Sequence, residues 1–249
     1  MTRVAYIDAP AGCAGDMFLG ALVDAGVPLA VLEEVVDGLG LEGVQLRVTR
    51  VERGALAATK VDVCKDGTPI GGAADVHLHG HGHSDEHGHG RTLADVLHAI
   101  GHLGDLSLPP LDKAAATFRH LAEAEARVHG RQPADVHFHE VGAADALVDV
   151  VGTCVGLHHL GVESVTVSPL PWSRGTVETQ HGTLPLPAPA TALLLEGHPT
   201  VASEETYEQV TPTGAALVRA LASGSRPPEG FVPRATGFGA GTFDRSRLP

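Results

Sequence analysis

Residues 4–23, VAYIDAPAGCAGDMFLGALV, indicate how the chain folds. Residues 4–8 form a short apolar run that ends at Ala9-Pro10, a pattern typical of a buried strand. Glycines punctuate the segment that follows, and Asp16 precedes apolar residues at helical spacing that stop near Gly26. The stretch therefore predicts a strand, a glycine-containing loop and a helix.

The loop between this strand and helix has the general layout of an anion site. Gly12 and Gly15 let backbone amides approach a phosphate, and the dipole of the following helix favours negative charge there. The spacing matches neither G-x-x-x-x-G-K-[ST] nor G-x-G-x-x-G, so the loop is not a recognised nucleotide-binding motif. Asp16 is a candidate catalytic carboxylate. Its alternative role is that of an N-cap, the commoner one for such a residue.

The pattern continues as a small α/β unit over residues 1–66. Residues 29–39 keep helical spacing behind Pro28, which suits the first position of a helix. Residues 44–51 and 56–63 alternate on either side of a Glu-Arg-Gly turn and so predict a β-hairpin. The order strand, helix, helix, strand, strand makes a compact unit.

A loop rich in histidine and glycine, residues 67–90, separates this unit from a second predicted α/β region, residues 91–249. We expect strands at 135–141 and 162–167 to pair in parallel through a right-handed crossover of the helix between them. The closing GFGAG run at 237–241 indicates a loop or an edge strand. The helices expected in this region are 93–103, 111–129, 143–160, 188–195 and 214–221.

Six histidines lie within thirteen residues of the 67–90 segment. Four of them alternate with other residues, so an extended backbone would place their imidazoles on one side. Imidazole is a preferred ligand of zinc, copper, iron and nickel, and such tracts are typical of metal binding. A solvated low-complexity linker is the alternative. The predicted ligands of this flexible metal acceptor are His77, His79, His81, His83, His87 and His89.

A second metal-ligating pattern is the sequence HFHE at residues 137–140. On a strand its two histidines share one face, and the carboxylate that follows allows three ligands to surround one ion. Asp145 and Asp149 come next at a spacing of four and lie on one side of a helix. The alternative is that one histidine is a satisfied core residue and the acids cap the helix. We favour a functional cluster, in which the metal ligands are His137, His139 and Glu140, and the last two are also catalytic.

Three further residues are candidates for holding a phosphate or another polar group. Arg174, a cation in an acidic protein, suits a phosphate or carboxylate anchor. Thr211 and Thr213 precede a helix and offer hydroxyls and backbone amides to a ligand. Ordinary turn and capping roles are the alternative for each of them. Together with Gly12 and Gly15, these residues form the predicted substrate- and phosphate-binding set.

Composition limits the classes of function. The chain has 17 Lys and Arg against 30 Asp and Glu, and only six Phe, two Tyr and one Trp, which argues against nucleic-acid binding. Its cysteines, Cys13, Cys64 and Cys154, form no CxxC pair and no disulfide framework. No apolar run approaches the roughly 18 residues of a membrane span, and the N-terminus lacks a secretory apolar region. We expect a cytoplasmic protein that does not bind membranes; whether it forms a homo-oligomer stays open.

Taken in order, these stretches resemble the nickel-insertion proteins of nickel-pincer cofactor biosynthesis, the LarC family. The resemblance covers essentially the whole chain and rests on AGCAGDMFLGALVDAGV, the histidine-rich segment, VHFHEVGAADALVDVVG, HGTLPLPAPATALLLEG, VTPTGAALV and GFGAG. It implies a cyclometallase, a lyase-type nickel chelatase, that inserts Ni²⁺ into pyridinium-3,5-bisthiocarboxylic acid mononucleotide. The product is the cofactor of lactate racemase and similar enzymes. The family reaction consumes CTP with Mg²⁺ or Mn²⁺.

The chain departs from the family pattern in two ways. Full-length relatives continue well beyond the GFGAG run, and the resemblance places their CTP-binding site in that C-terminal region. We therefore expect this chain to correspond to the N-terminal portion, and either to need a C-terminal partner polypeptide or only to bind nickel. Relatives also tend to read GxSGDM, whereas this chain has Ala14 in place of the serine.

The leading hypothesis is an enzyme subunit that delivers nickel to an organic precursor. The histidine-rich segment would gather Ni²⁺, the HFHE cluster would hold it near the precursor, and the glycine loop would lie near a phosphate. A nickel-storage protein or metallochaperone without catalysis is the first alternative. A metal-dependent hydrolase, with a metal-bound water as nucleophile, is the second.

Overall fold

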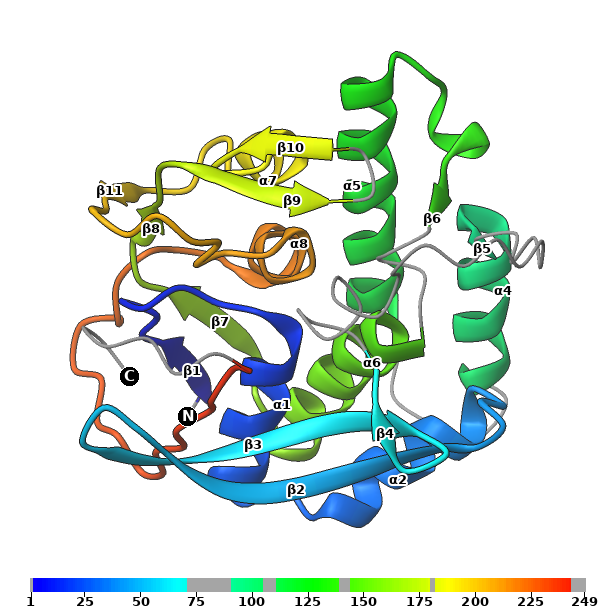
Figure 1. Ribbon diagram of the computed structural model, residues 1–249. Coiled ribbons are helices and arrows are strands. Elements are labelled where there is room, and N and C mark those ends of the chain that lie inside the picture. Colours follow the sequence, from blue (N-terminus) through cyan, green and yellow to red (C-terminus); the bar gives the residue numbers. More distant parts are fainter. Residues whose placement is uncertain (1, 71–90, 105–110, 139–143, 180–181, 243–249) are drawn as a thin grey trace.

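The computed structural model describes residues 2–70, 91–104, 111–138, 144–179 and 182–242 (Figure 1). It is a mixed α/β fold, as predicted, with both parallel and antiparallel strand pairs. In chain order the elements are β1 (Val4–Ile7), α1 (Gly15–Asp24), α2 (Leu29–Gly38), β2 (Val44–Arg53), β3 (Leu56–Lys65), β4 (Thr68–Pro69), β5 (Arg91–Thr92), α4 (Leu93–Gly104), α5 (Asp112–His129), the 3-10 turn η1 (Pro133–Asp135), β6 (His137–Phe138), α6 (Ala144–His159), β7 (Ser164–Val167), β8 (Leu170–Trp172), β9 (Thr176–Thr179), β10 (Gly182–Pro185), α7 (Pro189–Leu194), β11 (Thr200–Ala202) and α8 (Pro212–Leu221).

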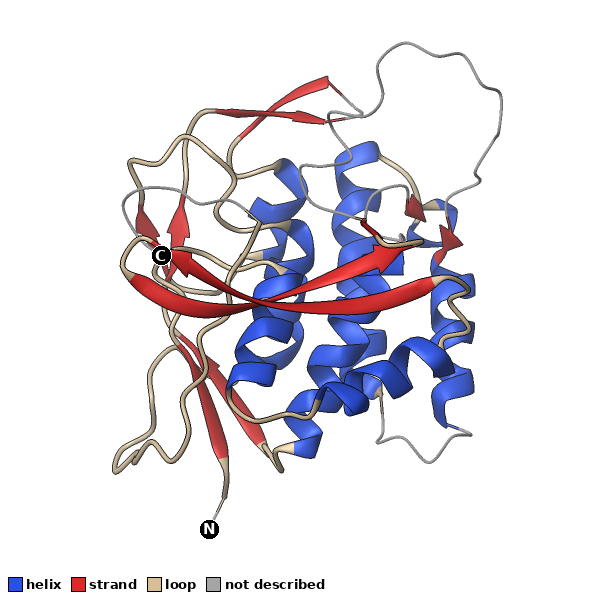
Figure 2. Ribbon diagram, turned by 60° about the horizontal axis from the view of Figure 1, so that its bottom comes forward, coloured by secondary structure: helices blue, strands red, loops and turns tan. Residues whose placement is uncertain are grey.

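The predicted hairpin of residues 44–63 is confirmed as the β2–β3 pair. The two strands are antiparallel and ten residues long, and the short β4 extends the sheet by one strand. β3 turns Val61 and Val63 inward, where they are buried with Leu19 of α1 and Leu32 of α2. Figure 2 shows the hairpin lying across the helices, so it closes one side of the helical core.

The predicted parallel pairing of residues 135–141 with 162–167 is wrong, because each of the two strands pairs with another strand. β7 pairs in parallel with β1, so that Val4 lies opposite Ser164, whereas β6 pairs antiparallel with β5. The later part of the expected strand, residues 139–141, lies outside the described residues. Apolar periodicity identifies a strand but not the neighbour that receives its hydrogen bonds. Here the first strand of the chain satisfies those backbone groups.

Helix α6 forms the centre of the core. Eleven of its sixteen residues are buried, and α1, α2 and α5 pack around it. The main apolar cluster joins Leu22 and Val35, from the early part of the chain, to Phe118, Leu147 and Leu217. The core is therefore shared across the predicted boundary after residue 66, and the division into two regions stays a prediction.

The six helices α2, α4, α5, α6, α7 and α8 begin and end within two residues of their predicted bounds. The Pro-rich stretch after β7 contains the antiparallel pair β9–β10 and the strand β8, which pairs in parallel with β11 beyond α7. The GFGAG run lies beside β3. There the N–H of Thr59 donates to the carbonyl of Phe238 at 2.8 Å, and the N–H of Ala240 donates to the carbonyl of Thr59 at 3.0 Å. Within the described residues, no helix has the length and apolar character needed to cross a membrane.

Candidate functional site

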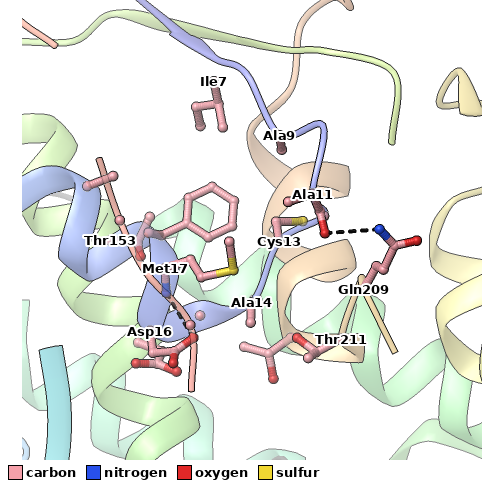
Figure 3. A pocket seen from close by; sticks show the side chains of 18 of the residues that line it. Ile7, Ala9, Ala11, Cys13, Ala14, Asp16, Met17, Thr153, Gln209 and Thr211 are labelled. Carbon is pink, nitrogen blue, oxygen red and sulfur yellow. Dashed lines mark hydrogen bonds between the residues drawn. The ribbon is translucent and has the colours of Figure 1, made fainter. Parts of the chain in front are cut away.

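The N-termini of α1 and α8 meet beside the glycine loop (Figure 3). Thr211 is the N-cap of α8, and its hydroxyl accepts a hydrogen bond from the backbone N–H of Gly214 at 3.1 Å. The backbone N–H of Thr211 donates to the carbonyl of Cys13, also at 3.1 Å. Gly214 permits this approach, because a β-carbon there would lie 2.3 Å from the same carbonyl oxygen. Two helix ends that carry positive partial charge therefore lie side by side.

The glycine loop is held against the segment that precedes α8. Gly12 has a φ of +104°, and a β-carbon there would lie 1.9 Å from the carbonyl oxygen of Gln209. The side-chain amide of Gln209 donates to the carbonyl of Ala11 at 3.3 Å (Figure 3). The loop geometry thus depends on a contact between residues about two hundred positions apart in sequence.

Asp16 does not take the N-cap role that was the alternative for it. α1 begins at Gly15, Ala14 is the N-cap, and no side chain caps this end of the helix. Asp16 lies in the first turn, where its Oδ1 accepts a hydrogen bond from the N–H of Met17 at 2.9 Å (Figure 3). Burial raises the pKa of Asp16, while Lys60 and the Met17 N–H lower it. The carboxylate is thus enclosed at the helix N-terminus.

A second acid, Asp149 of α6, is buried against the start of α1. The residue is 8% exposed, and a β-carbon on Gly15 would lie 2.2 Å from its Oδ2. The pKa of Asp149 is raised well above its usual range, first by burial and then by the charges of Asp16 and Asp145. The Oδ1 of Asp149 is buried without a hydrogen-bond partner among the described residues. The site therefore holds a proton at pH values where an exposed aspartate has lost it.

Lys60 of β3 supplies the positive charge at this site, and sequence reasoning missed it. Its residue is 8% exposed, its Nζ forms an ion pair with Asp62, and its charge lowers the pKa of both Asp16 and Asp149. Asp62 also pairs with Arg47 of β2, at 3.1 Å. The available signal was a lysine within a largely buried strand, since lysine is rarely buried without a partner.

These residues line one large cleft with a volume of about 3320 Å³. Pockets for small molecules usually measure roughly 300–1,000 Å³, so the cleft as a whole is not shaped to one small ligand. Its polar corner, at the N-termini of α1 and α8, is the better-defined site. The candidate residues that line the cleft are Gly12, Gly15, Asp16, Lys60, His137, Asp145, Asp149, Thr211 and Thr213.

The predicted metal ligands fall mostly outside the described residues. This applies to His139, Glu140 and the six histidines of the 67–90 segment. His137 is exposed, lines the cleft and lies opposite Thr92 in the β5–β6 pair. Within the part of the chain that the structure describes, no group of three or more His, Cys, Asp or Glu side chains could hold a metal ion. The HFHE metal site therefore stays a prediction.

The structure shows the surroundings of two other residues, the predicted anchor Arg174 and the loop residue Cys13. Arg174 is exposed, forms an ion pair with Glu204, and does not line the cleft. Cys13 lies in the glycine loop but is buried, and burial raises the pKa of its thiol to about 12. It therefore stays protonated at neutral pH and is neither a ready metal ligand nor a nucleophile.

Comparison with known proteins gives the family. The family described as "Nickel insertion protein" matches residues 5–249. The chain belongs to the nickel insertion protein family. No solved structure matches it.

Relatives in this family are similar over nearly the whole chain. A "Putative nickel insertion protein" of Citrifermentans bemidjiense is 45% identical over 249 residues, which is 99% of this chain and 59% of the relative. One from Thermomicrobium roseum is 47% identical over 246 residues, 96% of this chain and 54% of the relative. A "Pyridinium-3,5-bisthiocarboxylic acid mononucleotide nickel insertion protein" of Nocardioides sp. is 46% identical over 245 residues, 98% of this chain and 57% of the relative. The chain thus spans little more than half the length of these curated relatives.

Proposed function

We propose that this member of the nickel insertion protein family binds pyridinium-3,5-bisthiocarboxylic acid mononucleotide and takes part in inserting nickel into it. The reaction would be that of a CTP-dependent cyclometallase with Mg²⁺ or Mn²⁺, a lyase-type nickel chelatase of the cytoplasm, that forms the nickel-pincer cofactor of lactate racemase-type enzymes. Nickel is a substrate of this reaction. Family membership and the name of the Nocardioides relative support the proposal.

The observation that carries the proposal is the meeting of the α1 and α8 N-termini. A mononucleotide offers one phosphate, and helix N-termini bind phosphate through free backbone N–H groups and the helix dipole. Thr211 and Thr213 add two hydroxyls at the start of α8, and Gly12 and Gly15 keep side chains out of the loop. The corner suits the phosphate end of the precursor.

The two acids at the start of α1 suit the chemistry at the end of the precursor where nickel is inserted. Cyclometallation replaces a carbon-bound hydrogen by the metal, so a base must accept that proton as the metal–carbon bond forms. Asp16 and Asp149 lie at the α1 N-terminus, where burial raises the pKa of both acids and the charge of Lys60 lowers it. We assign the proton acceptor to Asp16, because Asp149 already holds its proton. His137, together with His139 and Glu140, would hold the incoming Ni²⁺, since imidazole and carboxylate are its ligands.

The phosphate assignment is tested by comparing two ligands, the precursor mononucleotide and the same compound without its phosphate. Thr213→Val removes a hydroxyl and keeps the side-chain shape. We expect it to weaken binding of the mononucleotide several-fold and to leave the dephosphorylated compound unaffected. Thr200→Val, on the exposed strand β11 outside the cleft, is the matched control. An equal loss of affinity for both ligands would show that the phosphate does not bind at this corner.

A nickel-storage protein or metallochaperone is the second candidate. The six histidines of the 67–90 segment support it as well as they support the enzyme, because a histidine-rich tract is typical of metal binding in either case. Such a protein would bind several nickel ions but show no affinity for the precursor. Calorimetric titration with the precursor in the absence of nickel separates the two functions.

A further inference from the structure

Two histidines on helix α4 have their ring nitrogens in contact. His98 and His102 are four residues apart, and their Nε2 atoms lie 3.0 Å from each other. The ring centroids are 4.4 Å apart and the ring planes cross at 78°. Both residues are exposed, so neither contact is imposed by burial in the core. Two ring nitrogens at this distance need a proton or a cation between them, because their lone pairs repel.

The spacing of the two nitrogens matches that of a chelated metal ion. Metal–imidazole bonds are about 2.0–2.1 Å long, so two nitrogens at right angles around one ion lie about 2.9 Å apart. That angle belongs to square-planar and octahedral coordination, which Cu²⁺ and Ni²⁺ adopt with nitrogen ligands. The observed 3.0 Å separation therefore accepts such an ion with almost no movement of either side chain.

The surroundings favour a cation. The two histidines line a small hollow of about 440 Å³ together with Gly38, Leu39 and Gly40. α2 ends at Gly38, and the C-terminal end of a helix carries negative partial charge. Asp95, one turn before His98, lines the same hollow and adds a carboxylate. The negative charge on both walls lowers the free energy of a bound positive ion.

We propose that His98 and His102 chelate a divalent transition-metal ion on the surface of α4. Water fills the remaining positions, since the described residues provide no third ligand in reach. The site is separate from the cleft and goes beyond the proposed nickel insertion, on which it does not depend. A site with two protein ligands exchanges its metal readily, as an accessory acceptor would.

The test uses the full chain with all six histidines of the 67–90 segment replaced by glutamine, so that they do not mask the site. Calorimetric titration with Ni²⁺ should then show a component that disappears in His98→Ala and equally in His102→Ala. Each single substitution should weaken that component roughly a hundredfold, because the second ligand of a chelate binds intramolecularly. The double variant His158→Ala with His159→Ala is the control. These exposed neighbours at the end of α6 point in different directions around the helix.

A second readout covers the case in which calorimetric components overlap. Ni²⁺ bound across one turn should raise the melting temperature of this background protein, and the increase should vanish in either single variant. Mg²⁺, which prefers oxygen ligands, should produce no increase. Unchanged nickel titrations and melting shifts in His98→Ala would overturn the site and leave the 3.0 Å contact as a hydrogen bond between two imidazoles.

Discussion

The carboxylate of Asp149 lies directly against the α-carbon of Gly15, so that a β-carbon there would come within 2.2 Å of its Oδ2. Through this contact the N-terminus of α1 packs against the buried acid of α6. The helix dipole favours negative charge at that point, whereas burial favours the protonated acid. Gly15 is thus required by packing as well as by any ligand that approaches the loop.

Gly15→Ala should therefore destabilise the protein. Overpacking a core contact costs about 1–3 kcal/mol, which for a chain of this size lowers the melting temperature by roughly 2–4 °C per kcal/mol. Thermal unfolding measures this loss of stability. Combining Gly15→Ala with Asp149→Ala should recover part of the lost stability. Gly101→Ala is the matched control, because its α4 position has no atom within 4 Å of a β-carbon. That substitution should stabilise the protein by about 0.5–1 kcal/mol. A Gly15→Ala protein that is as stable as the parent would contradict the contact.

Asp149→Asn should stabilise the protein increasingly as the pH rises. The pKa of Asp149 is raised in the folded protein by burial and by Asp16 and Asp145. Its contribution to stability is therefore complete below the unfolded pKa of about 3.9 and is lost as the pH rises towards the folded pKa. Asparagine resembles the neutral acid and avoids that loss. The difference in unfolding free energy should grow above about pH 4 by up to about 1.4 kcal/mol per pH unit.

Asp95→Asn provides the control with the opposite sign. Hydrogen bonds from the Thr92 hydroxyl and N–H lower the pKa of Asp95, so this exposed carboxylate stabilises the protein in its charged form. The variant should be less stable than the parent at neutral pH, and the difference should disappear as the pH falls through the lowered pKa. Thermal unfolding at pH 3.5, 5 and 7 checks both variants. An Asp149→Asn protein that is less stable than the parent at pH 7 would show that the acid is ionised and satisfied.

Local patterns in the sequence were sufficient to predict most elements. The β2–β3 hairpin and the helices from α4 to α8 follow from apolar periodicity and from glycine and proline punctuation, which act over a few residues. The partner of β7 was not predictable in this way. Its pairing with β1 depends on contacts between residues 160 positions apart, and no local pattern encodes them.

The sequence indicated which types of residue belong to the candidate site, but not how they are arranged in space. Gly12, Asp16 and Thr211 were selected for their residue types, and the cleft brings them together because α8 docks on the glycine loop. Arg174 was selected for its charge, yet its side chain pairs with Glu204 at the surface. Residue type alone does not give side-chain direction. Lys60 faces the site from a strand that sequence reasoning treated only as part of a hairpin.

Lys60→Met should weaken precursor binding, whereas Arg174→Met should not. Lys60 is the buried cation beside Asp16 and Asp149, and hydrogen bonds to charged groups contribute about 1.5–3 kcal/mol, or roughly a tenfold to hundredfold change in affinity. Arg174 lies outside the cleft, and an exposed ion pair such as its own contributes about 0–1 kcal/mol to stability. Equilibrium binding of the precursor, with far-UV circular dichroism to confirm folding, measures both variants. If Arg174→Met weakened precursor binding and Lys60→Met did not, Arg174 would be the anchor of the precursor.

Under the proposed function, this chain alone should bind the precursor but fail to form the nickel cofactor from precursor, Ni²⁺ and CTP. The chain spans 54–59% of the length of these relatives, and under the proposal the CTP site belongs to the portion of the family that this chain does not match. The glycine loop does not replace such a site, because no Walker-type lysine follows it. A polypeptide with the remaining portion of a relative, added in trans with Mg²⁺ or Mn²⁺, should restore synthesis. Asp16→Asn in this chain should then abolish it while Arg174→Met leaves it intact. Efficient synthesis by the isolated chain would instead place the nucleotide site within the cleft described for the precursor and the metal.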